Sequence, residues 1–305
     1  MGMNMMCRGG GLAAALAAAV LVAGCGAAEQ GGGGPAPAGT TGGGPPTSAA
    51  AAAEQRELQV NRSYWYAGFK VTLGTARLSS EPPVVTIEAT FQNLSPDHSA
   101  KPPGDLILTS GADSYDELSE ELPSVPARRS RTGVIAIRVD DKFALSEAVL
   151  TVGEPRSRQA VVPLARPDGL ISLEPRPVSM RGRTFPQGRK DVFITVTGGE
   201  VRADDTTNLA QAPAGQEFVL VSFTATNDGA AGMTYVFDRD LTLVLPDGTK
   251  AGNAGSCSRA QVYVQPHATV TPPGQACFAV PAPATGTFRF VWHNKDSEGL
   301  RFSIG

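Results

Sequence analysis

Apolar and polar residues alternate along many short segments of this 305-residue chain, and few folds accommodate that pattern. Residues 69–73 (FKVTL) and 85–91 (VTIEATF) both show it. A period of two with Val, Ile, Thr and Phe is typical of half-buried strands. Only residues 115–122 suggest a short helical turn. The sequence therefore predicts an all-β protein, and further strands are expected at 106–108, 134–139, 148–152 and 160–164.

The same order of segments occurs twice. Residues 193–197 match 69–73, and residues 219–227 match 85–93, each of the longer segments ending in an asparagine, Asn93 or Asn227. We expect both asparagines to form Asx turns at strand ends. The sequence therefore predicts two tandem β-sandwiches, at 57–165 and 188–305, joined by a linker at 166–187. The other matched segments are 105–108 with 240–243 and 132–139 with 273–280.

The amino terminus has the composition of an export signal. Arg8 supplies positive charge, and the uncharged stretch 11–24 that follows is shorter than the roughly 20 residues that span a bilayer. The stretch ends in LVAGC at Cys25, which resembles the lipobox of bacterial lipoproteins. That resemblance implies a signal peptide at 1–24 and a diacylglyceryl group on the Cys25 thiol. The alternative is a plain secretory signal, cut near Ala23 or Ala27.

Residues 26–53 consist almost entirely of Gly, Ala, Pro, Thr and Ser. These side chains bury little apolar surface, so ordering them costs entropy without compensation. We therefore expect the segment 25–56 to be a lipidated cysteine followed by a flexible, disordered tether.

The order of strand motifs resembles the telokin-like, immunoglobulin-fold domains of bacterial lipoproteins of unknown function. The motifs are residues 85–93, 105–108 and 133–139 in the first copy, and 219–227, 240–243 and 274–280 in the second. The resemblance implies immunoglobulin-like sandwiches, and it brings no catalytic residues.

Together these features predict a non-enzymatic protein, anchored to the extracytoplasmic face of the cell membrane through lipid on Cys25. It would bind an unknown envelope protein or polymer, or serve as a structural module, without a cofactor. The net charge of −3 argues against a nucleic-acid partner. The alternative is an envelope enzyme or metal carrier whose site lies between the two domains.

Few residues are candidates for chemistry. His98, His267 and His293 lack the spacing of a zinc site. An acidic run suggests either Ca²⁺ ligation or, more simply, solvated ion pairs with Arg128, Arg129 and Arg131; it lacks the spacing of an EF-hand. The run comprises Asp113, Asp116, Glu117, Glu120 and Glu121.

Two further stretches invite a binding interpretation. Residues 176–190 carry five basic residues and no acid. This stretch is either a solvated linker or a docking strip for anionic polymers or lipid head groups. The five basic residues of 176–190 are Arg176, Arg181, Arg183, Arg189 and Lys190.

An aromatic cluster lies at the start of the first sandwich. Alternation would place Trp65 and Phe69 on one strand face and Tyr64 and Tyr66 on the other. One face would then be core and the other a sugar- or partner-binding platform.

Two pairs of neighbouring aspartates, Asp140–Asp141 and Asp204–Asp205, are expected as turn residues rather than catalytic carboxylates.

Cysteine usage predicts one disulfide. Cys7 lies in the signal peptide and Cys25 takes lipid, which leaves Cys257 and Cys277 as an even pair in an exported protein. A bridge across a loop of about 20 residues stabilises the folded state by roughly 3 kcal/mol in the chain-entropy model. The alternative is a pair of buried thiols.

A thiol assay on denatured, non-reduced mature protein tests this pairing. We expect Cys257 and Cys277 to give no free thiol, because an oxidising compartment favours the bridge. Two titratable thiols at these positions would rule the disulfide out.

Overall fold

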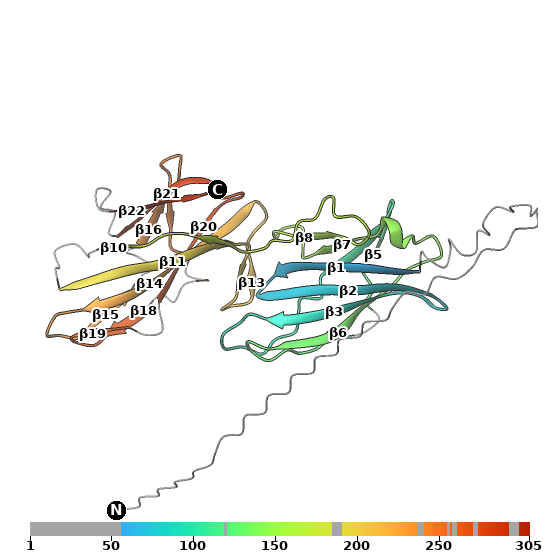
Figure 1. The fold of residues 1–305 in the computed structure, drawn as a ribbon, viewed down its shortest axis with the longest axis horizontal. Coiled ribbons are helices and arrows are strands. Elements are labelled where there is room, and N and C mark those ends of the chain that lie inside the picture. The colour runs from blue at the N-terminus through green and yellow to red at the C-terminus, as the bar shows by residue number, and fades with distance from the viewer. Residues whose placement is uncertain are drawn as a thin grey trace, which may run out of the picture. The chain divides into compact units, whose positions relative to one another are not determined.

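The computed structural model describes residues 56–118, 121–184, 191–236, 241–254, 257, 261–270, 274–292 and 299–305. The signal peptide, Cys25 and the tether up to residue 55 lie outside this range. Throughout these described ranges the regular secondary structure is almost entirely strand, which confirms the all-β prediction (Figure 1). The helical element among these residues is one 3-10 turn, Leu145–Glu147, rather than a turn at 115–122. No described helix has the length and apolar character needed to cross a bilayer.

The first sandwich consists of two antiparallel four-stranded sheets. One has the order β1-β2-β3-β6 and the other the order β5-β4-β7-β8. The strands are β1 (Glu57–Tyr66), β2 (Phe69–Ser80), β3 (Pro83–Asn93), β4 (Leu106–Ser110), β5 (Asp113–Tyr115), β6 (Ser130–Arg138), β7 (Val149–Val152) and β8 (Ala160–Pro163).

The second sandwich repeats this arrangement with additions. Its larger sheet places β11 beside β14, with β9 and β10 on the β11 side and β19 and β20 on the β14 side, and its smaller sheet has the order β17-β16-β21-β22. Two short ribbons, β12 with β13 and β15 with β18, complete it. The strands are β9 (Arg176–Val178), β10 (Gly182–Thr184), β11 (Val192–Arg202), β12 (Asp204–Asp205), β13 (Ala210–Gln211), β14 (Gln216–Asn227), β15 (Met233–Val236), β16 (Leu241–Val244), β17 (Lys250–Gly252), β18 (Gln261–Val264), β19 (Ala268–Thr269), β20 (Gly274–Pro281), β21 (Gly286–Trp292) and β22 (Leu300–Ile304).

Each sandwich has its own core between its two main sheets. In the first, residues of β3 and β6 such as Ile87 and Ile135 pack with Leu108 and Leu150 from the opposite sheet. In the second, the core contains Val221 and Phe278 from one sheet and Leu243, Phe290 and Phe302 from the other. The alternation that predicted the strands therefore corresponds to inward-facing apolar side chains.

Cross-strand pairing shows the two copies residue by residue. Phe69 lies opposite Asn93, whereas Val192 lies opposite Asn227. The counterpart of Phe69 is therefore Val192, so the sequence match of Phe69 with Phe193 was wrong by one residue. A one-residue slip reverses the face of every side chain, and pairing with Asn227 puts Val192 and Ile194 in the core.

The two asparagines have the same structural role, and both Asx turns are confirmed. Asn93 is completely buried, and its Oδ1 accepts the N–H of Ser95 at 2.9 Å. Its Nδ2 donates to the carbonyls of His98 at 2.7 Å and Val125 at 2.9 Å. Asn227 repeats the turn, accepting the N–H of Gly229 at 3.0 Å. Each amide therefore satisfies backbone groups from the loop that follows its strand.

The disulfide between Cys257 and Cys277 is present, with a Cα–Cα distance of 5.6 Å. It lies on the outer face of the larger sheet, in a small apolar cluster with Ala212, Phe218 and Leu220. The loop that carries Cys257 runs beside β20, because the amide of Ala254 donates to the Cys277 carbonyl at 2.7 Å. The bridge therefore fixes this loop over β14 and β20.

Residues 166–187, expected as a linker, contain two strands. Both β9 and β10 pair with β11. Just before them, Ile171 exchanges two backbone hydrogen bonds with Val161, and Ser172 accepts the amide of Trp65 at 2.8 Å. The segment thus runs along the first sandwich and then joins the larger sheet of the second.

The buried asparagine predicts a stability effect. Asn93→Ala leaves the Ser95 amide and the carbonyls of His98 and Val125 without their hydrogen-bond partner. Because buried polar groups without partners are costly, we expect the free energy of unfolding to fall by about 2–3 kcal/mol. The exposed neighbour provides the control, since Gln92→Ala should change stability by less than about 0.5 kcal/mol. Denaturant unfolding measures both variants, and equal effects would contradict this role of Asn93.

Candidate functional site

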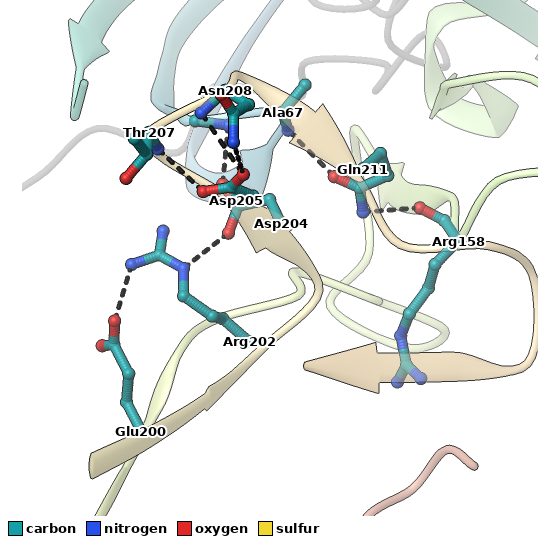
Figure 2. A network of polar contacts seen from close by, with 10 residues as sticks. Ala67, Arg158, Glu200, Arg202, Asp204, Asp205, Thr207, Asn208 and Gln211 are labelled. Atoms are coloured by element: carbon teal, nitrogen blue, oxygen red, sulfur yellow. Dashed lines mark hydrogen bonds and ion pairs between the residues drawn. The ribbon is translucent and has the colours of Figure 1, made fainter. Parts of the chain in front are cut away.

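The polar residues that converge most closely lie where the two sandwiches meet, within the single compact unit formed by residues 46–305. The turn between β1 and β2 contacts the β12–β13 ribbon (Figure 2). The amide of Ala67 donates to Gln211 Oε1 at 2.9 Å, and the amide of Gly68 donates to Asp204 Oδ2 at 2.7 Å. Two backbone donors of a tight turn thus receive side-chain acceptors more than 130 residues away.

Glycine is required at position 68. Its φ is +79°, a region that other residues rarely adopt. A Cβ on this residue would also overlap the Leu209 side chain. The close approach of the turn to the ribbon therefore depends on the absence of a side chain here.

A short stretch of backbone pairing lies beside this turn. Ser157, between β7 and β8, forms an antiparallel bridge with Pro213. The amide of Arg158 donates to the Ala212 carbonyl, and the amide of Ala214 to the Arg156 carbonyl, both at 2.9 Å. Gln211 Nε2 adds a bond of 2.9 Å to the Arg158 carbonyl (Figure 2). The loop of the first sandwich thus forms a two-stranded pair with the chain entering β14.

Asp204 and Asp205, expected as turn residues, form the short strand β12 just before the turn at 206–209, and their exposed fractions are only 1% and 2%. Asp204 Oδ1 accepts a charged hydrogen bond of 2.8 Å from Arg202 Nε, and Glu200 Oε1 lies 3.0 Å from Arg202 Nη1. Asp205 accepts the Thr207 amide and the Asn208 side chain, each at 2.8 Å. Burial opposes the charge of Arg202, but the two carboxylates outweigh it and raise the pKa of the guanidinium.

Glu217 binds groups from three segments that are distant in the sequence. It is buried at the start of β14 and accepts Arg158 Nη2 at 2.8 Å and Arg176 Nη2 at 2.9 Å. The amide of Ala284, in the turn before β21, donates to it at 2.9 Å. One buried charge therefore holds the β7–β8 loop, β9 and the β20–β21 turn together.

We call these groups the junction: the 67–68 turn, residues 156–158, Arg176, residues 200–217 and Ala284. Its carboxylates accept hydrogen bonds from arginines, amides and an asparagine of the chain itself. Such an arrangement positions segments of backbone, because each of these carboxylates is hydrogen-bonded where it lies; Arg202 Nη2 is buried with no hydrogen-bond partner among the described residues. The sequence analysis did not identify Glu217, Arg158 or Gln211 as candidates. Their partners lie 41 to 144 residues away, so no local sequence pattern indicates these contacts.

The two described histidines, His98 and His267, do not belong to the junction. His98 and His267 are exposed, and His293 lies outside the described residues. His98 participates through its backbone, with its carbonyl bound by Asn93. Among the residues that the structure describes, no group of three or more His, Cys, Asp or Glu side chains is arranged to hold a metal ion.

The acidic run forms exposed ion pairs with partners other than those expected. Glu117 lies 2.6 Å from Arg138, and Glu121 pairs with Lys101, whereas Arg128, Arg129 and Arg131 had been the expected partners. Cross-strand and loop contacts decide this, since Glu117 accepts the amide of Arg138 through its backbone as well. Asp113 and Asp116 are exposed, and Glu120 lies outside the described residues.

The aromatic cluster is mostly core, which corrects the expected division between faces. Tyr64, Tyr66 and Phe69 are all buried in the first core. Alternation holds only within one strand, and the chain reverses at residues 67–68, so Tyr66 lies opposite Phe69. Trp65 lies on the outer face with Lys70 Nζ 5.0 Å from its ring centroid. Burial raises the pKa of Tyr64.

Asp140 and Asp141 line a pocket of about 210 Å³ with Arg56, Ser79 and Phe143. The Tyr115 hydroxyl donates to Asp140 Oδ1 at 2.7 Å. This bond is the main cause that lowers the pKa of Asp140. Desolvation, together with the Asp140 bond, raises the pKa of Tyr115 to about 12. Asp140 therefore stabilises a loop at the end of the first sandwich.

In the basic stretch, Arg176 is committed to the junction, where it also donates to the Ala284 carbonyl at 3.2 Å. Arg181 is exposed. Arg183 belongs to β10, and Arg189 and Lys190 lie outside the described residues.

The junction predicts a large effect of neutralising Glu217. Glu217→Gln keeps the shape but leaves two arginines facing an uncharged amide, and we expect about 3 kcal/mol lower stability. The same substitution in an exposed pair is the control. Glu88 lies 2.6 Å from Arg77 with both side chains about half exposed, so Glu88→Gln should cost less than about 1 kcal/mol. Denaturant unfolding compares the two, and a larger loss for Glu88→Gln would contradict the role of Glu217.

Comparisons with known proteins assign no family to this chain. No protein-family model and no curated protein matches the chain. A conserved hypothetical protein from Bacillus anthracis is similar over 44% of this chain and 100% of its own, with 11% identity and a TM-score of 0.34. A conserved domain protein from the same organism is similar over 77% of this chain and 76% of its own, with 10% identity and a TM-score of 0.24. Likenesses this distant carry no conclusion about the activity or partners of this chain.

Proposed function

We propose that this chain is a lipid-anchored protein of the extracytoplasmic face of the cell membrane, which acts as a non-enzymatic binding or structural module. Lipid on Cys25 attaches it to the membrane, and its two sandwiches face an envelope protein or polymer. The LVAGC motif after an uncharged stretch supports the anchor. Two acyl chains hold a protein at a membrane where one chain gives only reversible binding.

The junction is the observation that carries the module interpretation. Asp204, Asp205 and Glu217 are the buried carboxylates most suited to acid–base chemistry, and each is bonded to groups of the chain itself. A catalytic carboxylate needs lone pairs directed at a substrate. Asp204 and Glu217 instead connect the two sandwiches, and Asp205 binds its own turn, which supports a protein that presents surfaces.

The immunoglobulin-like resemblance agrees with this proposal. Folds of this kind commonly place binding surfaces on loops and sheet faces. The alternative, an envelope enzyme or metal carrier with a site between the domains, gains no supporting contact among the described residues.

Metabolic labelling with a radioactive fatty acid tests the anchor. The full chain should carry label and sediment with membranes, and Cys25→Ala should lose the label and leave the membrane fraction. Cys7→Ala is the matched control, because Cys7 lies inside the expected signal peptide and its loss should leave labelling of Cys25 intact. Label on Cys25→Ala protein, or none on the wild type, would refute lipid attachment.

A further inference from the structure

The outer face of the β1-β2-β3-β6 sheet has a hollow of about 420 Å³, a volume within the range of small-molecule sites. The side chains around it are exposed or half-buried, and they alternate with the core residues Val71, Phe91 and Ile135. This face of the sheet is therefore open to solvent at the hollow. The outward residues that line it are Asn61, Thr72, Gly74, Glu88, Thr90, Thr132 and Val134.

Two irregularities in neighbouring strands lie at this hollow. The register of β1 on β2 shifts around Asn61, and the register of β2 on β3 shifts around Gly74. Asn61 also has a φ of +47°, which side chains other than asparagine, aspartate and glycine seldom adopt. Bulges of this kind bend a strand and redirect its side chains, and they are frequent beside functional sites.

The second sandwich shows that the fold does not need glycine at position 74. By the register of the two copies, Gly74 corresponds to Thr197 and Glu88 to Ser222. The Thr197 hydroxyl donates to the Ser222 carbonyl at 3.2 Å. A Cβ on Gly74 would lie 3.4 Å from Glu88 Cβ, which is an ordinary contact. Glycine weakens a strand interior, so what it provides at position 74 is space beside Glu88.

The groups around the hollow both donate and accept hydrogen bonds. Ser63, Thr72, Thr90 and Thr132 form a row of hydroxyls in register across the four strands, and the first two share a bond of 2.8 Å. Within the described part of the chain, the hydroxyls of Thr90 and Thr132 and the amide of Asn61 have no hydrogen-bond partner. Threonine methyl groups lie between these polar atoms. A matching ligand carries hydroxyls on its edge and C–H groups on its faces, which is the chemistry of a sugar ring.

The charges around the hollow favour a neutral ligand. Glu88 lines it and lies 2.6 Å from Arg77, which also pairs with Glu57. Lys70, in the next outward row, lies over the ring of Trp65 at 5.0 Å from the centroid. Among the described residues that line the hollow there is no Lys or Arg. An anionic polymer would therefore meet a carboxylate there and no cation in the lining to bind it.

We propose that this hollow binds a neutral polysaccharide of the cell envelope. Asn61, Thr90 and Thr132 bond to sugar hydroxyls, and the space at Gly74 admits the ring. The hydroxyl row crosses four strands that are about 4.8 Å apart, which suits a chain of sugars better than a single one. Trp65 follows Ser63 on the same face of β1, so its half-buried indole extends the surface with an apolar ring. This identification of the partner rests on the proposed function.

Binding of the full chain to neutral hexasaccharides, measured by isothermal titration calorimetry, tests the proposal. The probes are cellohexaose, maltohexaose, chitohexaose and mannohexaose, and we expect the wild type to bind at least one. Gly74→Thr should weaken that binding tenfold or more, because the new side chain fills the space that the ring needs. Thr197 stands at the equivalent position, so the variant should keep its fold, which thermal unfolding checks.

A pair of double variants separates hydroxyl contacts from general effects on the sheet. Thr90→Val/Thr132→Val removes two hydroxyls of the hollow while keeping side-chain shape, and it should weaken binding tenfold or more. Thr109→Val/Thr151→Val is the matched control, because it removes two hydroxyls from the outer face of the other sheet. This control should retain wild-type affinity.

Four results would overturn the proposal. They are no binding of any hexasaccharide by the wild type, wild-type affinity in folded Gly74→Thr protein, equal losses in both double variants, and a wild-type dimer that Gly74→Thr dissociates. The last would assign the hollow to a second copy of this chain. Fatty-acid labelling of Cys25 is measured separately, so failure of the anchor and failure of sugar binding are distinguishable.

Discussion

A buried carboxylate requires donors on every side, and Glu217 obtains them from three segments that are distant in sequence. Arg158 comes from the first sandwich, Arg176 from β9 of the second, and Ala284 from the turn after β20. Removing either arginine leaves the buried carboxylate of Glu217 with one cationic partner instead of two. This requirement links the β7–β8 loop, β9 and the β20–β21 turn, and the Asp204 contacts extend the linkage to the 67–68 turn.

The duplicated fold separates what the sandwich needs from what each copy adds. Both copies keep the strand order, the inward apolar residues and the buried asparagine that closes the long central strand. They differ on their outer faces. The second copy has a disulfide-fixed loop over β14 and β20, and it carries Arg289 and Arg301 on β21 and β22 where the first has Val149 and Pro163.

The sequence was sufficient for features set by local periodicity and by counting. Alternation predicted the strands, Asn93 and Asn227 predicted their turns, and the two remaining cysteines predicted their bridge. It was insufficient where a single residue changes the register. The tight turn at 67–68 reversed the expected faces of Tyr66 and Phe69, and a one-residue slip displaced the match of Phe69. The junction could not be anticipated, because Asp204 and Glu217 gain partners only when distant loops meet.

The central claim is that the two sandwiches are joined by buried hydrogen bonds, and the amide of Gly68 reports on it most directly. Its bond to Asp204 Oδ2 is buried and links the β1–β2 turn to β12. Native-state hydrogen exchange followed by NMR would measure its protection. The account predicts that the Gly68 amide, and those of Arg158 and Ala214, exchange only slightly faster than amides in the centre of β3. Exchange of all three at the rate of an exposed loop amide would contradict it.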